Sequence, residues 1–329
     1  MMWEIAKLGD ISKNIQTGPF GSQLHQSDYS ECGIPVVMPK DLVGGKISEE
    51  SIARVDKTHV ERLCRHKIEV GDILYSRRGD VGRCAHVTKK EEGWLCGTGC
   101  LRVTIDSEKA DSRFVFFQLQ HPDTVGWVEK HAVGATMLNL NTTILSSVPI
   151  RLPTLEIQKR IADILSAYDD LIENNQKQIK LLEEAAQRLY KEWFVDLRFP
   201  GHENTKIVDG VPEGWSRTNI NEILTFHRGY DLTKNEMKAG RYPVVGSTTV
   251  IGYHNEFKIK GPGIVTGHSG SLGKYQFIWD NFWPHNTSLY ISDYKDHNIF
   301  FVYSLLQTVD FASLNNGGSH SDIESKRAF

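Results

Sequence analysis

The feature that most constrains this 329-residue chain is a stretch without glycine or proline, which runs from Leu155 to Val195. Apolar residues recur in it at alternating intervals of four and three, the spacing of a coiled-coil seam. The seam consists of Ile161, Leu165, Tyr168, Ile172, Asn175, Ile179, Leu182, Ala186, Leu189 and Trp193. Asn175 is the polar member, a residue type that fixes register and partner number. The pattern predicts a helix of about 60 Å. Its wide apolar stripe cannot stand alone in water, so it needs a partner helix.

The segments on either side of this helix resemble each other. Similar stretches begin at Trp3 and Trp215, and three more matches follow in the same order. These are GDILYSRRGDVGR with PGIVTGHSGSLGK, TGCLRVTI with NTSLYI, and FVFFQLQ from Phe114 with FFVYSLL from Phe300. Each copy contains short β-branched runs bounded by Gly, Pro and Asp, and a helix-like segment near its end. This pattern predicts mixed α/β domains.

The fold class that follows is α+β, with two similar domains joined by a long coiled-coil-type spacer helix. We expect the first domain over residues 1–150, the spacer over 151–199, a linker over 200–214 and the second domain over 215–329. The matches to the first copy end at Gly317-Gly318-Ser319, so the second domain is expected to lack its C-terminal helix.

Composition limits the class of protein. With 40% hydrophobic and 24% charged residues, and no apolar run of membrane-helix length, the chain is expected to be soluble. The net charge of −3 gives no global nucleic-acid signature, although a local basic face is sufficient for phosphate contacts. Five cysteines indicate a reducing, cytoplasmic compartment. Cys96 and Cys100 with His86 could hold a metal, but buried free thiols are the favoured interpretation.

The order of repeat, helix and repeat resembles the specificity (S) subunit of type I restriction-modification enzymes. The resemblance covers essentially the whole chain and is carried by GPFGSQLHQSDY, GIPVVMPKDL, GDILYSRRGDVGR and WLCGTGCLR. Its most specific block is GATMLNLNTTILSSVPIRLPTLEIQKRIADILSAYDDLIE, from Gly134 into the central helix. The resemblance implies two target-recognition domains, each reading one half of a bipartite DNA site. Because the two copies differ in their loops, the site should be asymmetric.

The resemblance also implies the partners of the chain. They are double-stranded DNA, methyltransferase (M) subunits docked on the spacer, and endonuclease (R) subunits. Catalysis would belong to the methyltransferase and endonuclease subunits, which would bind S-adenosylmethionine, ATP and Mg. This chain would then be a non-catalytic recognition subunit that binds no cofactor and no metal and has no membrane partner. Without a second long helix, its seam should recruit a helix in trans, most simply by antiparallel pairing of two spacer helices in a homodimer.

Candidate DNA-contacting residues lie in loops at matching positions of the two copies. In the first copy they are Gln23, Lys40, Arg77, Arg78 and Arg83. In the second copy they are Arg228, Tyr230, Ser247, Thr248, His268, Ser269 and Lys274. These side chains can contact phosphates or base edges, and the sequence leaves both open. Phe20 and Tyr230 could stack on bases, but packing within the domain is the favoured interpretation.

The main alternative is a metal-dependent DNA endonuclease. Asp280, followed by Asp293 and Lys295, could mimic a carboxylate–lysine core that holds a metal. Such triplets arise by chance, as Glu324-Ser325-Lys326 illustrates, so this is the minority interpretation. A coiled-coil adaptor without DNA function is a third possibility. Metal-dependent cleavage and salt-dependent retention on DNA would separate the three.

Overall fold

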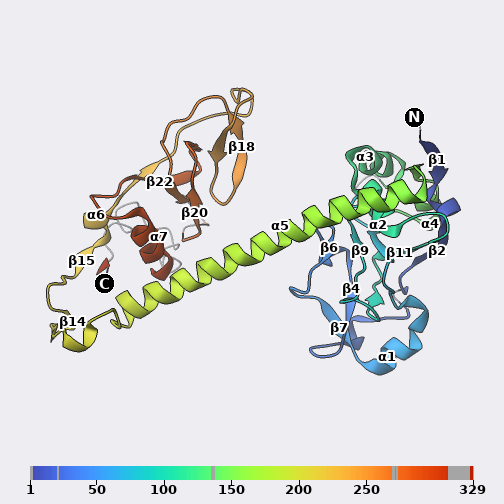
Figure 1. The fold of residues 1–329 in the computed structure, drawn as a ribbon, viewed down its shortest axis with the longest axis horizontal. Coiled ribbons are helices and arrows are strands. Elements are labelled where there is room, and N and C mark those ends of the chain that lie inside the picture. Colours follow the sequence, from blue (N-terminus) through green and yellow to red (C-terminus); the bar gives the residue numbers. More distant parts are fainter. Residues whose placement is uncertain are drawn as a thin grey trace. The chain divides into compact units, whose positions relative to one another are not determined.

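The structure, a computed structural model, describes residues 3–20, 22–134, 138–268, 271, 273–309 and 327–328. It divides into two compact units, Met1–Asn174 (unit 1) and Asn175–Phe329 (unit 2). The predicted long helix is present as α5 (Leu155–Tyr190), followed by a π-helical turn over Lys191–Val195 (Figure 1). The first part of α5 belongs to unit 1 and the rest to unit 2. No helix in the described ranges is both long and apolar enough to span a membrane.

Unit 1 contains two four-stranded sheets. The first is antiparallel throughout and has the order β2 (Ser12–Thr17), β11 (Cys100–Ile105), β8 (Ile73–Ser76) and β9 (Cys84–His86). The second has the order β10 (Leu95–Cys96), β4 (Ile34–Val37), β7 (Ala53–Val55) and β3 (Tyr29–Ser30), and its β10–β4 pair is parallel. Two small sheets complete it, β1 (Glu4–Lys7) with β12 (Pro149–Leu152) and β5 (Leu42–Val43) with β6 (Lys46–Ile47).

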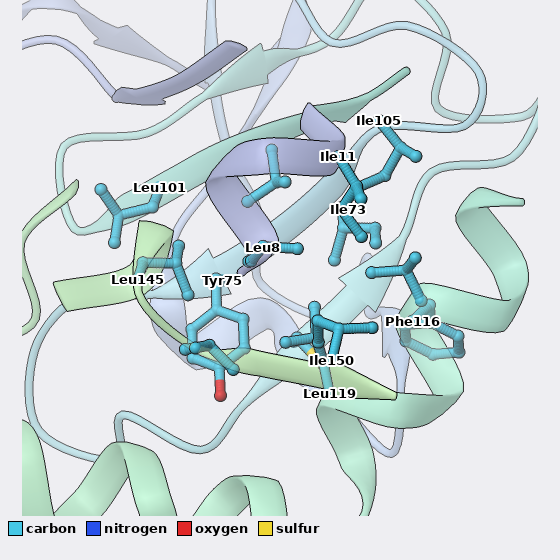
Figure 2. Packing of buried hydrophobic residues seen from close by; sticks show 14 of the residues in the cluster. Leu8, Ile11, Ile73, Tyr75, Leu101, Ile105, Phe116, Leu119, Leu145 and Ile150 are labelled. Carbon is cyan, nitrogen blue, oxygen red and sulfur yellow. The ribbon is translucent and has the colours of Figure 1, made fainter. Parts of the chain in front are cut away.

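In the described part of unit 1, four short α-helices accompany these sheets, and their starts follow from capping residues. They are α1 (Lys57–Arg62), α2 (Ser112–Gln120), α3 (Pro122–His131) and α4 (Thr142–Ser146). Asp111 accepts hydrogen bonds from the first turn of α2, and Asn141 does the same for α4. Figure 2 shows the main core, where side chains of the first sheet, α2, α4 and β12 pack together; it includes Leu8, Ile73, Tyr75, Leu101, Leu119, Leu145 and Ile150.

Unit 2 has a corresponding pair of sheets. The first has the order β16 (Thr225–Arg228), β22 (Ser288–Asp293), β19 (Gly263–Gly267) and β20 (Tyr275–Ile278). The second has the order β18 (Val250–His254), β17 (Tyr242–Val245) and β21 (Trp283–Pro284), with β17–β21 parallel. The other described strands and α-helices of unit 2 are β13 (Ile207–Val208), β14 (Val211–Pro212), β15 (Thr218–Asn219), α6 (Ile220–Ile223), α7 (Ile299–Thr308) and β23 (Arg327–Ala328), and a short 3-10 helix spans His202–Asn204.

The two units share one topology, as the internal repeat predicts. The antiparallel sheet has the same order in both, and each second sheet contains one parallel pair beside an antiparallel strand. Two details of the alignment were wrong. The N-caps Asp111 and Asn298 set the helix register, so that Phe114 matches Phe301 and not Phe300. The second copy also extends further than its last sequence match, because β23 pairs with β15 as β12 pairs with β1.

Most of the apolar seam of α5 is exposed in the part of the chain that the structure describes. Ile161 packs against the core of unit 1, and Trp193 is half-buried. Between them the seam residues are exposed, and Leu182 is the extreme case at 69%. A stable helix rarely exposes such an apolar seam to water, so a partner helix is still expected on physical grounds.

Candidate nucleic-acid interface

In unit 1 the candidate loops meet where four strands end. The Gly18 N–H donates to the Cys100 carbonyl (2.9 Å), the Gly97 N–H to the Val37 carbonyl (2.9 Å), and the Arg77 N–H to the Gly99 carbonyl (2.8 Å). These bonds join the segments that follow β2, β4, β8 and β10. We call residues 18–20, 22–23, 38–40, 77–83 and 97–99 the strand-end cluster of unit 1, with Gly21 outside the described residues.

Unit 2 repeats this arrangement bond for bond. The Gly229 N–H donates to the Ser288 carbonyl (3.0 Å), the His285 N–H to the Val245 carbonyl (2.8 Å), and the His268 N–H to the Thr287 carbonyl (3.1 Å). The strand-end cluster of unit 2 therefore consists of residues 228–230, 246–248, 268–274 and 285–287, with Ser269, Gly270 and Leu272 outside the described residues. The matching candidate loops found in the sequence are thus neighbours within each unit.

A glycine is required at one point of each cluster for reasons of space. A Cβ on Gly18 would lie 1.9 Å from the Gly97 carbonyl oxygen, and one on Gly229 would lie 2.1 Å from the His285 carbonyl oxygen. Both obstacles are backbone atoms that are held by the bonds described above, so they cannot rotate away. The early loop of each copy can cross the cluster only with glycine at this position.

The predicted side chains of unit 1 divide into exposed and engaged groups. Arg78 is exposed, and Arg83 is exposed but paired with Asp80, with Nε 2.7 Å from Oδ2. Arg77 is half-buried, and its Nε has no hydrogen-bond partner within the described part of the chain. The loop that carries these arginines is anchored by the Leu140 N–H, which donates to the Arg77 carbonyl (2.8 Å).

Gln23 and Lys40 are already used within the loops. The Gln23 Oε1 accepts the Phe20 N–H (3.1 Å), which closes the early turn. The Lys40 Nζ donates to the Ser51 carbonyl (2.8 Å), although the side chain remains exposed. Their intramolecular bonds make both residues loop-positioning groups as well as candidates for contact.

The candidates of unit 2 show the same division. The Arg228 Nε donates to the Asn286 carbonyl (3.0 Å), and the Ser247 Oγ donates to the Thr287 carbonyl (2.7 Å). Thr248 and Lys274 are exposed and His268 is half-buried, whereas Ser269 lies outside the described residues.

The two aromatic candidates behave differently from each other. Tyr230 packs inside unit 2, where its hydroxyl lies 3.0 Å from that of Tyr290 and its ring meets Trp283 edge-on at 6.4 Å. Phe20 is 54% exposed, so packing was the wrong expectation there. An exposed ring at the rim of a strand-end cluster is available for stacking.

The central segment of each cluster was not among the candidate contact residues predicted from the sequence. In unit 1 it is Gly97-Thr98-Gly99, and in unit 2 it is His285-Asn286-Thr287. The Asn286 Nδ2 donates to the Asp231 Oδ1, and the His285 Nδ1 lies 3.0 Å from the Thr287 Oγ1. A signal was present, because each segment directly precedes or overlaps the matched TGCLRVTI and NTSLYI stretches.

Neither metal interpretation gains support from the geometry. Cys84, Cys96 and Cys100 are buried free thiols, and burial raises the pKa of Cys84 and Cys96 to about 12. The described residues include no group of three or more His, Cys, Asp or Glu side chains placed to hold a metal ion. Of the proposed nuclease core, Lys295 donates through Nζ to the Asn221 carbonyl (2.7 Å). Glu324-Ser325-Lys326 lie outside the described residues.

The chain is similar in sequence to the specificity subunits of two type I restriction enzymes. The chain is 28% identical over 243 residues to the type I restriction enzyme MjaIX specificity subunit of Methanocaldococcus jannaschii, which covers 71% of this chain and 54% of the relative. It is 27% identical over 198 residues to the HindI specificity subunit of Haemophilus influenzae, covering 59% of this chain and 41% of the relative. The chain thus spans about half the length of the curated relatives it matches.

A solved structure and a family model extend this result. The type I restriction-modification S subunit of M. genitalium matches with a TM-score of 0.63 at 17% identity, covering 99% of this chain and 83% of that one, so the two share a fold. The family model of the type I restriction modification DNA specificity domain matches residues 2–184 and 212–327, which cover most of both units. Two copies of one topology, a long helix between them and this match lead to one conclusion: the chain belongs to the type I restriction-modification DNA specificity family.

Proposed function

We propose that this chain is the non-catalytic recognition subunit of a type I restriction-modification enzyme and reads a bipartite, asymmetric double-stranded DNA target. The observation that carries this proposal is the pair of strand-end clusters. Their backbone hydrogen bonds are the same, but their side chains differ. By these bonds, Arg77 of unit 1 is equivalent to His268 of unit 2, and Gly97 of unit 1 is equivalent to His285 of unit 2. One frame with two sets of side chains suits the reading of two different half-sites.

The charge distribution supports DNA contact by unit 1 in spite of the net charge of −3. Lys40, Arg77, Arg78 and Arg83 all lie in one strand-end cluster, within loops that are joined by backbone hydrogen bonds. A local group of cations can neutralise phosphates, and arginine can also donate two hydrogen bonds to guanine in the major groove.

The test compares half-sites. Replacing residues 76–83 of the chain, assembled with its methyltransferase subunits, should change the methylated sequence in one half-site and leave the other intact. Arg78→Ala should weaken binding to DNA that carries the first half-site. The control is Arg62→Ala, an exposed arginine of α1 outside the cluster. A change in both halves, or in neither, would contradict the assignment.

The partners follow from the same proposal. Methyltransferase and endonuclease subunits would supply S-adenosylmethionine, ATP and Mg, and the complex would act on DNA in the cytoplasm. Relatives of this chain are named as specificity subunits of type I restriction enzymes, which supports this division of labour. The endonuclease alternative has no comparable support.

The exposed seam of α5 is proposed to pair with a helix in trans. Burying one large apolar side chain stabilises a complex by about 1.5–3 kcal/mol, so several exposed seam residues provide a strong driving force. Two copies pairing antiparallel, with Asn175 fixing the register, would be the simplest solution. Light scattering of the purified chain should then give twice the mass of the 37.3-kDa chain, and Leu182→Glu should prevent this. A soluble monomer that is indifferent to Leu182→Glu would exclude seam pairing.

A further inference from the structure

In unit 2 the central segment of the strand-end cluster, residues 285–287, is held by side chains as well as by backbone hydrogen bonds. The Arg228 Nε donates to the Asn286 carbonyl (3.0 Å), and the Ser247 Oγ donates to the Thr287 carbonyl (2.7 Å). The Asn286 side chain therefore extends from a segment whose carbonyl oxygens are already bonded to neighbouring loops.

The side-chain amide of Asn286 has a defined orientation. Its Nδ2 donates a hydrogen bond to the Asp231 Oδ1. A carboxylate accepts hydrogen bonds and does not donate them, so the amide nitrogen, and not the amide oxygen, faces Asp231. Asp231 is exposed and Asn286 is half-buried, so a ligand at the surface can reach the amide. A polar group that is oriented before binding loses less conformational freedom when it binds.

The amide of Asn286 keeps both a donor and an acceptor for a ligand. Nδ2 has a second hydrogen, and Oδ1 accepts no hydrogen bond from the described residues. In the major groove of DNA, adenine presents one acceptor, N7, beside one donor, the N6 amino group. Guanine presents two acceptors, thymine presents one acceptor, and cytosine presents one donor. Adenine is the base whose edge matches both free atoms of the amide.

A phosphate group is a poorer partner for this amide than a base. The Asp231 carboxylate beside it is negatively charged, and the Asn286 Oδ1 is itself an acceptor, so both repel phosphate oxygens. Arg228 is exposed and carries the positive charge that a phosphate contact requires. Contact with a base edge is therefore the role that suits Asn286.

The equivalent positions of unit 1 have different chemistry. By the backbone bonds that the two clusters share, Thr98 is the counterpart of Asn286, and Phe20 is the counterpart of Asp231. Thr98 has a single hydroxyl in place of the amide, and the Phe20 ring has no acceptor that could orient a polar neighbour. The two units therefore cannot read a base in the same way at this position.

We propose that Asn286 reads one adenine of the half-site bound by unit 2, with Asp231 as the residue that positions its amide. The Asn286 Oδ1 accepts a hydrogen bond from the adenine N6 amino group, and Nδ2 donates a hydrogen bond to N7. This inference rests on the proposed function, because it requires that unit 2 binds a half-site. It adds the residue that makes the contact and the base that is read.

The first step of the test leaves the protein unchanged. The methylated target of the chain, assembled with its methyltransferase subunits, is mapped. The half-site of unit 2 is the half that exchange of residues 76–83 leaves intact. Each adenine of the target is then replaced in turn by 7-deazaadenine, which pairs with thymine but lacks the N7 acceptor, and fluorescence anisotropy gives the affinity of each duplex. One adenine in the half-site of unit 2 should show a loss of about twofold to tenfold.

The second step assigns this loss to Asn286. Asn286→Ala should remove the response to 7-deazaadenine at this adenine, because the variant has no Nδ2. Asn286→Asp keeps the size of the side chain but has no donor for N7, so it should also remove the response. Asp231→Ala should reduce the response, because the amide is then free to rotate. The controls are Thr98→Ala, the matched substitution in unit 1, and Asn255→Ala, an exposed asparagine just after β18; both should retain the full response.

The outcomes separate this inference from the proposed function. The inference is overturned if no adenine in the half-site of unit 2 responds to 7-deazaadenine, or if the response survives Asn286→Ala and Asn286→Asp. Either result, with binding still specific for the mapped target, leaves the proposed function intact. An unchanged response in Asp231→Ala refutes the positioning role of Asp231. A complex that binds the mapped target no better than a scrambled duplex overturns both the inference and the proposed function.

Discussion

Replacing Gly18 by alanine tests the close approach at the centre of the unit 1 strand-end cluster. The added Cβ would lie 1.9 Å from the Gly97 carbonyl oxygen and 2.6 Å from its carbon, whereas ordinary contact begins at 3.4 Å. Neither segment can move freely, because the Gly18 N–H is bonded to the Cys100 carbonyl and the Gly97 N–H to the Val37 carbonyl, each at 2.9 Å. The two loops must separate, and at least one of these bonds must lengthen or break.

The expected destabilisation is about 3 kcal/mol. Overpacking costs about 1–3 kcal/mol, and a lost backbone hydrogen bond adds about 1 kcal/mol. For a domain of about 150 residues, each kcal/mol lowers the midpoint by about 2–4 °C, so unit 1 should melt about 6–12 °C lower. Differential scanning calorimetry of the full chain would measure this shift, with the transition of unit 2 as an internal reference.

Gly126→Ala is the matched control in the same unit. Gly126 lies within α3, no atom is within 4 Å of its added Cβ, and its backbone is compatible with alanine. This substitution should stabilise unit 1 by about 0.4–1 kcal/mol, because alanine has less conformational freedom to lose on folding. The reasoning is refuted if Gly18→Ala lowers the midpoint by less than about 2 °C, or if the two glycine variants shift it in the same direction.

Three further predictions concern individual side chains of unit 1. Burial and the charges of Arg65 and Arg102 lower the pKa of His66 to about 4, so the stability that neutral His66 provides is complete above about pH 6.5 and is lost as the pH falls toward 4. Unfolding curves between neutral and mildly acidic pH should show this loss, and His66→Gln should reduce it. Gln158→Ala should lower stability by about 2 kcal/mol in denaturant titrations, because buried Gln158 bonds both the Asp111 N–H (3.0 Å) and the Pro153 carbonyl (2.9 Å); an unchanged midpoint would contradict it. A thiol reagent at neutral pH should quickly modify only the exposed Cys32 and Cys64. It should reach the buried Cys84, Cys96 and Cys100 only after unfolding.

The sequence by itself determined the features that depend on local pattern. A long run without glycine or proline and with alternating spacing predicts a helix, and α5 begins at the expected Leu155 and continues through a π-helical turn to Val195. The internal matches predicted a common topology, since similar alternation and turn residues place similar strands in the same order. The family resemblance rested on those same local blocks and is confirmed by the family match over both units.

The tertiary structure alone decided how distant segments meet. Gly97-Thr98-Gly99 became the centre of a cluster only because backbone bonds link it to β4 and β8, and no local pattern encodes such pairing. The engagement of Lys40 by Ser51 likewise depends on loops that come together on folding. The alignment of α2 with α7 is shifted by one residue from the sequence match, because capping and burial set the helix register and a sequence alignment does not take them into account. The ion pair between Arg113 of α2 and Asp163 of α5, at 2.8 Å, is another such case, because it depends on where α5 packs after the chain has folded.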